Sequence, residues 1–229
     1  TVYSVQELVE NCPCPVLAAV PDVSGRERKW WNRRKPQDGE TPDPQVQSER
    51  ALLGDSVGFA AAERHLNATF GDALVNHYTW VIAGDGCLME GINHEAIGLA
   101  GTLKLSRLKV LWDDNRITID GDTSLSTTED IPARYRASGW DVFECDGHDY
   151  ADIKRALAEA AASDKPTLVA CRTIIGKGAP NKQGGHDVHG APLGAEEIAA
   201  ARQGLGWTAE PFVIPEEILA DWRAIGAKG

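Results

Sequence analysis

From residue 51 onward the chain alternates amphipathic helical patterns with short apolar runs, and this alternation restricts the folds available to it. Helical patterns cover 51–71, 92–105, 130–139 and 150–163, and apolar runs cover 77–84, 108–115, 141–147 and 166–174. Nearly continuous apolar strands joined by helices are typical of a parallel sheet that is buried on both sides. We therefore predict an α/β fold, an open parallel sheet with helices on both faces.

The first fifty residues follow neither a helical nor a strand period. They hold six of the twelve prolines, together with dense charge and two adjacent tryptophans. We predict an irregular segment over 1–50 and one folded domain over 51–229. Two other interpretations stay open for this segment: residues 13–23 can form an isolated strand, and "RKWWNRRK" can bind nucleic acid or a partner instead of forming a solvated linker. "NCPCP" does not make a zinc site, because the second cysteine pair is lacking.

Composition excludes several classes of function. The net charge of −11 opposes attraction to nucleic acid and to anionic membranes. The five scattered cysteines do not form a disulfide framework, and neither a membrane span nor a signal-peptide pattern is present. We expect a reduced, cytoplasmic protein that binds small molecules and neither nucleic acid nor a membrane.

The most informative motif is Gly84-Asp85-Gly86, which follows an apolar run directly. Ligands of open parallel sheets bind beyond the carboxyl ends of the strands. The next predicted strand ends at Asn115, after one intervening helix, so we expect the two strands to be neighbours. Oxygen ligands on adjacent strand ends suit Mg²⁺, which completes its octahedron with phosphate and water. The pattern therefore predicts a magnesium diphosphate site.

Other interpretations of these residues have less support. A dinucleotide-binding GxGxxG and a Walker loop are both absent, and "NHEAIG" lacks the second histidine of a zinc protease. Taken singly, Asp85 can cap a helix and Asn115 can shape a turn. "HDVH" resembles half of a two-histidine metal site, but no further ligand lies near it in the sequence.

Taken together, the motifs resemble a known family. The stretch "GDGCLMEGINHEAIGLAGTLKLSRLKVLWDDNRITIDG" closely resembles the core of transketolases, thiamine diphosphate (ThDP) enzymes that transfer two-carbon ketol units between sugar phosphates. "RYRASGWDVFECDGHD", "KPTLVACRTIIGKGAPNKQGGHDVHGAPLG" and "LGWTAEPFVIPEEI" continue the resemblance, which covers roughly 57–222.

The resemblance implies a cofactor, a metal and their ligands. The metal is Mg²⁺, or Ca²⁺ in its place, and the implied ligands are Asp85, Asn115 and the Ile117 carbonyl. The implied ThDP-binding residues are Gly84, Asp85, Gly86, Asn115, Ile117 and His186. Two catalytic residues are implied: Glu90, in a network that links paired cofactor sites, and His186, which contacts the diphosphate and the substrate.

The chain also departs from the family. Its first fifty residues do not resemble the family's first hundred, and the family's pyrimidine-binding domain, whose glutamate activates ThDP, does not follow. We expect a ThDP and Mg²⁺ subunit for ketol transfer, working on sugar phosphates with a partner that carries that domain. The alternative is a truncated remnant that acts as a binding module or has a different, weak activity. Without the family's N-terminal stretch, apolar surface of the core should be left exposed, and exposed apolar surface favours association. We therefore expect a homo-oligomer.

Overall fold

The computed structural model describes residues 44–227, with side chains described from residue 53 onward. The chain divides at residue 44 into two units, and the unit from Gln45 to Gly229 contains the fold described below. The interpretations of residues 1–43 lie outside the described residues. The predicted irregular segment was too long at its end, because residues 44–50 belong to a helix. The first described helix, α3, spans Pro44–Phe70 and therefore begins earlier than the helical pattern at residue 51. It ends at Gly71, whose φ of 80° favours glycine.

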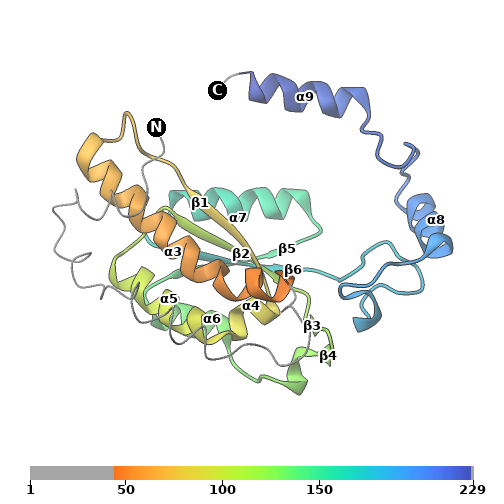
Figure 1. The fold of residues 1–229 in the computed structure, drawn as a ribbon, viewed down its shortest axis with the longest axis horizontal. Helices are drawn as coiled ribbons and strands as arrows, with labels where there is room; N and C mark the ends of the chain where they lie inside the picture. The colour runs from red at the N-terminus through yellow and green to blue at the C-terminus, as the bar shows by residue number, and fades with distance from the viewer. Residues whose placement is uncertain (1–43, 228–229) are drawn as a thin grey trace, which may run out of the picture. The chain divides into compact units, whose positions relative to one another are not determined.

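A four-stranded sheet forms the centre of this unit (Figure 1). All three strand pairs are parallel, in the order β1-β2-β6-β5. The strands are β1 (Thr79–Gly84), β2 (Leu108–Asp114), β5 (Asp141–Asp146) and β6 (Thr167–Arg172). The prediction of an open parallel sheet is confirmed.

Helices connect these strands, as the alternating pattern predicts. They are α4 (Asp85–Met89), α5 (Gly91–Thr102), α6 (Ile131–Ala137) and α7 (Tyr150–Ala162). Two of them have side-chain N-caps: Asp130 accepts from the Ala133 N–H at 2.9 Å, and Asp149 accepts from the Ala151 N–H at 2.8 Å. These caps fix where α6 and α7 begin. Among the described helices none is long and apolar enough to cross a membrane.

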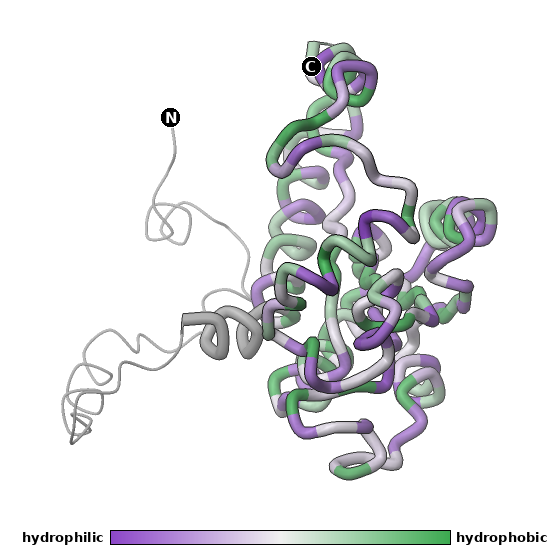
Figure 2. The backbone as a smooth tube through the Cα atoms, turned by 90° about the vertical axis from the view of Figure 1, so that its right-hand side faces the viewer, coloured by the Kyte–Doolittle hydropathy of each residue, from purple (hydrophilic) through white to green (hydrophobic). Residues whose placement is uncertain are grey.

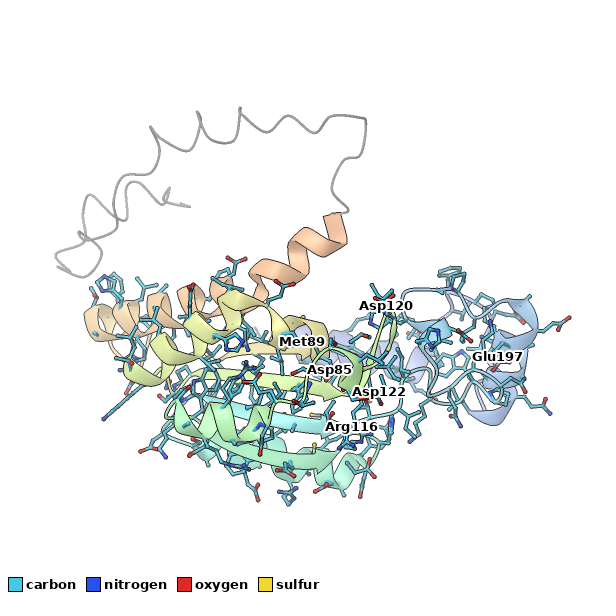
Figure 3. All side chains as sticks on the ribbon, turned by 90° about the horizontal axis from the view of Figure 1, so that it is seen from below. Asp85, Met89, Arg116, Asp120, Asp122 and Glu197 are labelled. Carbon is cyan, nitrogen blue, oxygen red and sulfur yellow. The ribbon has the colours of Figure 1, made fainter. Side chains whose placement is uncertain are left out.

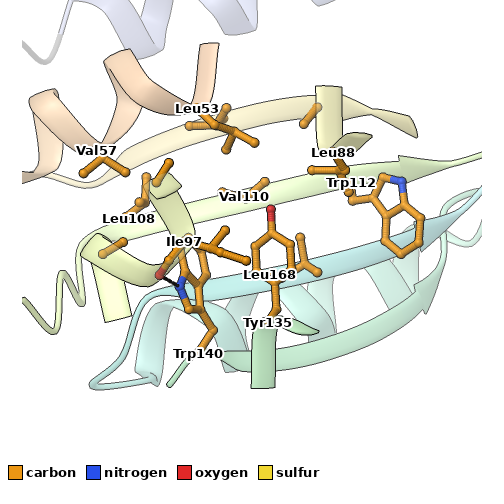
Figure 4. Close-up of a cluster of buried hydrophobic side chains, with 14 of the residues drawn as sticks. Leu53, Val57, Leu88, Ile97, Leu108, Val110, Trp112, Tyr135, Trp140 and Leu168 are labelled. Carbon is orange, nitrogen blue, oxygen red and sulfur yellow. Dashed lines mark hydrogen bonds between the residues drawn. The ribbon is translucent and has the colours of Figure 1, made fainter. Parts of the chain in front are cut away.

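One face of the sheet carries the larger core (Figure 4). Alternate residues of the strands point to this face and pack beneath α3, α5 and α6. Its fully buried members include Leu108, Val110, Leu168 and Tyr135. Trp140 joins this core and donates its indole N–H to the Ile97 carbonyl of α5 at 2.9 Å. This face is closed by apolar contacts from several helices.

The opposite face is covered less completely. Its core is small and lies between α7 and the strands β5, β6 and β2, around Val169 and Ala156. On β1 the residues of this face are solvent-accessible, with Trp80 43% and Ile82 73% exposed. The prediction of helices on both faces is thus confirmed, with unequal coverage of the two.

Several elements have no counterpart in the sequence prediction. Residues 117–125 form the two-residue strands β3 (Ile117–Thr118) and β4 (Gly121–Asp122) and the 3₁₀ helix η2 (Thr123–Leu125). Later come the 3₁₀ helix η3 (His186–Val188) and the helices α8 (Ala195–Gly204) and α9 (Glu216–Gly226). The last of these, α9, buries none of its side chains. Figure 2 shows it beside the C label, with hydrophilic and hydrophobic residues mixed along the tube.

Candidate functional site

The site lies where β1 and β2 end. The two strands are neighbours in parallel register, and Gly84 pairs with Asp113. Asp85 directly follows β1, and Asn115 directly follows β2. The prediction that these residues follow adjacent strands is therefore confirmed, and it brings their side chains to one edge of the sheet.

Asp85 is the first residue of α4 and only 7% exposed. Its Oδ1 accepts from the indole N–H of Trp112 at 3.1 Å, and its Oδ2 accepts from the Arg116 N–H at 3.1 Å. Burial raises the pKa of this carboxyl to about 6, and the negative charges of Asp114 and Asp113 add to the rise, against the opposing effect of the hydrogen bonds. A cation at this carboxylate would lower that pKa again, because it favours the charged form.

The turn after β2 holds the other predicted ligands. The Asn115 Oδ1 accepts from the Ile117 N–H at 2.8 Å, while its Nδ2 donates to Asp113 Oδ2 at 3.2 Å. Arg116 between them adopts a φ of 61°, which is uncommon for a residue other than glycine. Asp113 also accepts a short hydrogen bond from the Thr173 hydroxyl of the β6 end. Hydrogen bonds within the turn, and one from the end of β6, thus stabilise this loop.

A cavity of about 540 Å³ opens at this edge. Five of the predicted cofactor residues line it together: Gly84, Asp85, Gly86, Asn115 and Ile117. At Gly84 and Gly86 an added Cβ would meet no atom within 4 Å, so the backbone there faces open space. This arrangement leaves room for a ligand group to approach the main chain.

The donor set fits a magnesium diphosphate. A carboxylate, an amide oxygen and a backbone carbonyl are the hard oxygen ligands that Mg²⁺ prefers. No group of three or more His, Cys, Asp or Glu side chains in the described part of the chain is arranged to hold a metal. A metal at this edge would therefore need the mixed set of Asp85, Asn115 and Ile117, with further ligands from phosphate or water.

A second cavity of about 1210 Å³ adjoins the first, and Asp85 lines both. Met89, Arg116 and Asp122 lie around it, as Figure 3 shows at the end of the sheet. Arg116 and Arg172 both contact Asp114, at 3.9 and 3.2 Å. Asp85 therefore lies between the two cavities.

The structure separates the two histidines of "HDVH". His189 lines the 540 Å³ cavity, together with Ile175 and Gly190. The side chain of His186, which the sequence analysis favours, is 57% exposed and lies 3.5 Å from Asp187 Oδ1, and it lines neither cavity. The family resemblance pointed to His186, the first of the two, and His189 was left out of the predicted site, because the spacing of the two histidines does not rank one above the other.

Glu90 occupies the junction between α4 and α5. Its backbone is extended, with φ −67° and ψ 142°. It is the C-cap residue of α4 and also the N-cap residue of α5. It lines neither cavity. The structure thus places Glu90 at a break between two helices, a short helix away from Asp85.

Comparison with known proteins agrees with this geometry. A family model described as "Transketolase, thiamine diphosphate binding domain" matches residues 50–229. The chain belongs to the transketolase family. Over 77% of its length it is 60% identical to the transketolase of Cereibacter sphaeroides, and over 75% it is 54% identical to transketolase 1 of Escherichia coli. Each match covers 27% of the relative, so the chain spans about a quarter of their length.

Solved transketolases share the fold. The chain resembles the enzyme from Leishmania mexicana with a TM-score of 0.72 and 45% identity, over 75% of this chain and 27% of that one. A Pichia stipitis variant gives a TM-score of 0.73 and 42% identity, over 77% of this chain and 27% of that one. Residues 50–229 therefore match the ThDP-binding domain of the transketolase family, and the described fold resembles the same part of solved transketolases.

Proposed function

We propose that the chain is the Mg²⁺- and ThDP-binding part of an enzyme that transfers two-carbon ketol units between sugar phosphates. The observation that carries the proposal is the convergence of Asp85, Asn115 and Ile117 on one cavity, in a chain of this family. The pyrimidine-binding domain comes from a partner chain or from further residues of the same protein. Binding and orientation of the cofactor are the work of the part described here.

Each residue has a defined role in this proposal. Asp85, Asn115 and the Ile117 carbonyl would hold Mg²⁺, and the open backbone at Gly84 and Gly86 would leave room for the diphosphate. When bound, ThDP would supply a nucleophilic thiazolium carbon for ketol transfer. Asp85 must be deprotonated to bind the metal, and burial opposes this, so metal binding and deprotonation are coupled.

His189 takes the role that the sequence analysis gave to His186. A neutral imidazole at the cavity can donate to a phosphate or to a substrate oxygen and can move a proton. Glu90 is proposed to join a network with a second subunit, since it lies at a helix break and not in the cavity. Lys177, which lines the larger cavity, adds positive charge that attracts sugar phosphates.

The enzymatic proposal is tested by a ketol-transfer assay with a ketose phosphate, an aldose phosphate, ThDP and Mg²⁺. We expect the 229-residue chain to be inactive alone and active when mixed with a transketolase pyrimidine-binding domain. In the mixture, His189→Ala should lower the rate at least tenfold, while the matched control His186→Ala should retain it. Equal losses would contradict the assignment of His189. No activity in any mixture would favour the binding-module alternative.

We also propose that the chain self-associates through apolar surface. Trp80 and Ile82 of β1 are exposed on the face that α7 does not cover. Exposed apolar groups of this size favour association. Light scattering of the wild type and of a Trp80→Ser/Ile82→Thr variant tests this: we expect the variant to shift toward monomer. A wild type that is monomeric at all micromolar concentrations contradicts the proposal.

A further inference from the structure

Helix α4 is short, and both of its ends matter to the proposed site. It spans Asp85–Met89, so it begins with the proposed metal ligand and ends one residue before Glu90. A helix this short cannot satisfy its last carbonyl groups by its own hydrogen bonds. Its position therefore depends on side chains from other elements.

Two side chains hold the carbonyl end of α4. The Leu88 carbonyl accepts from Asn93 Nδ2 and from Arg134 Nη2, each at 2.9 Å. The Asn93 backbone N–H donates to the Glu90 carbonyl at 3.0 Å. Asn93 thus bonds the chain on both sides of the break between α4 and α5, while Arg134 ties the same carbonyl to α6.

Tyr135 anchors the side chain of Asn93. The Tyr135 hydroxyl donates to Asn93 Oδ1 at 2.8 Å, and both residues are completely buried. Figure 4 shows the Tyr135 hydroxyl pointing into the apolar core beneath α5. A flipped amide would set Oδ1 against the Leu88 carbonyl, two acceptors together, whereas the tyrosine hydroxyl can either donate or accept. The Leu88 carbonyl therefore fixes the orientation of the amide, and the tyrosine hydroxyl anchors its oxygen.

We propose that Asn93, anchored by Tyr135, is a positioning residue for the cofactor site. It fixes α4 between the sheet and α6, and so holds Asp85 at the metal and Glu90 at the helix break. This role rests on the proposed function, since it acts through ligands that the family resemblance assigns. Supporting residues of this kind usually change metal affinity about 10- to 100-fold when they are removed.

A purely structural role is the main alternative, and Trp140 provides a matched control. Trp140 is 3% exposed and donates a buried hydrogen bond of 2.9 Å to Ile97 of α5 in the same core. Its ring packs edge-on against Tyr135, a contact that a phenylalanine retains, and its indole N–H bonds α5 and not α4. Trp140→Phe should therefore lower the melting temperature without changing cofactor affinity. Asn93→Ala should lower the affinity for ThDP with Mg²⁺ about tenfold, even under conditions where both variants are fully folded.

Tyr135→Phe separates the anchoring hydrogen bond from packing, because it keeps the ring and the fold. We expect roughly fivefold weaker binding of ThDP with Mg²⁺, the value of one neutral hydrogen bond. Because Tyr135 acts through Asn93, the double variant Asn93→Ala/Tyr135→Phe should bind no more weakly than Asn93→Ala alone. Additive losses, or equal losses in Asn93→Ala and Trp140→Phe, would overturn the proposal.

Hydrogen exchange of the ligand-free chain gives a readout that does not depend on cofactor binding. Peptides covering 85–90 should exchange faster in Asn93→Ala and Tyr135→Phe than in wild type, while peptides from β2 should not change. Unchanged exchange over 85–90, or faster exchange throughout the sheet, would contradict positioning. If the wild type binds no ThDP, the proposed function fails, and the exchange result still decides whether Asn93 holds α4.

Discussion

Two buried charged side chains lie near opposite ends of the first two strands, and their surroundings differ. Lys109, at the amino end of β2, is fully buried and donates to the Ser163 carbonyl, the Lys165 carbonyl and the Thr167 hydroxyl at 3.0–3.3 Å. Asp85, at the carboxyl end of β1, accepts two hydrogen bonds but borders two cavities. Protein groups surround the first charge, whereas the second is open to a ligand.

Burial disfavours the charged form of both side chains, and it therefore shifts their pKa values in opposite directions. Burial lowers the pKa of Lys109 to about 8, helped by Arg107 and opposed by Asp141 and Asp164. Burial raises the pKa of Asp85 to about 6. The comparison suggests that a buried charge marks a binding site only where its surroundings leave space for a partner.

The largest expected effect comes from removing the open charge. Asp85→Ala should weaken binding of ThDP with Mg²⁺ at least 100-fold, because the metal loses its carboxylate ligand. Differential scanning calorimetry checks this: saturating ligand at 100 times the dissociation constant should stabilise the wild type by about 2.7 kcal/mol, and the variant hardly at all. Equal stabilisation of both proteins would remove Asp85 from the site.

Lys109 should give the next largest effect, on stability alone. Its folded pKa lies below its unfolded value, so the unfolded chain binds more protons between pH 8 and 10.5 and stability rises with pH. We expect wild type to gain about 2 kcal/mol between pH 8 and pH 10 relative to Lys109→Met. Urea unfolding at both pH values measures this, and parallel pH profiles of the two proteins would refute it.

Asp85 should give the smallest effect, with the opposite sign. Its folded pKa is raised, so its contribution to stability is present at low pH and declines as pH rises from about 4 through 6. The ligand-free wild type should gain about 1 kcal/mol from pH 7 to pH 5 relative to Asp85→Asn. Affinity for Mg²⁺ should fall over the same interval, as protons compete with the metal. An unchanged difference between the two proteins would exclude the raised pKa.

Much of the fold follows from local patterns in the sequence. Apolar runs such as the one ending at Gly84 predicted the strands. The helical pattern between the first two runs predicted that β1 and β2 are neighbours, and they are. The strands β3 and β4 were not predicted, because two-residue strands have no period to detect. Uncovered apolar surface was predicted, but its location on β1 was not, since apolar residues in a strand do not reveal whether a helix will cover them.

The candidate site was predictable in part, for a similar reason. Asp85 and Asn115 follow strand ends, so sheet geometry alone brings them together. His189 lies in a long loop after β6, where the backbone path and not a periodic pattern decides which side chain reaches the cavity. The Asn93–Tyr135 hydrogen bond joins residues 42 positions apart, and only the packing of α5 against α6 creates it.

The central claim is that the carboxyl edge of β1 and β2 binds ThDP through a metal ion. Isothermal titration calorimetry of the wild-type chain with ThDP, in Mg²⁺ and then in excess chelator, tests it most directly. We predict saturable binding with Mg²⁺ and none with chelator, since the diphosphate would then face Asp85, Asp113 and Asp114 without a cation between them. Equal binding in both conditions, or no binding at millimolar ThDP with Mg²⁺, would contradict the account.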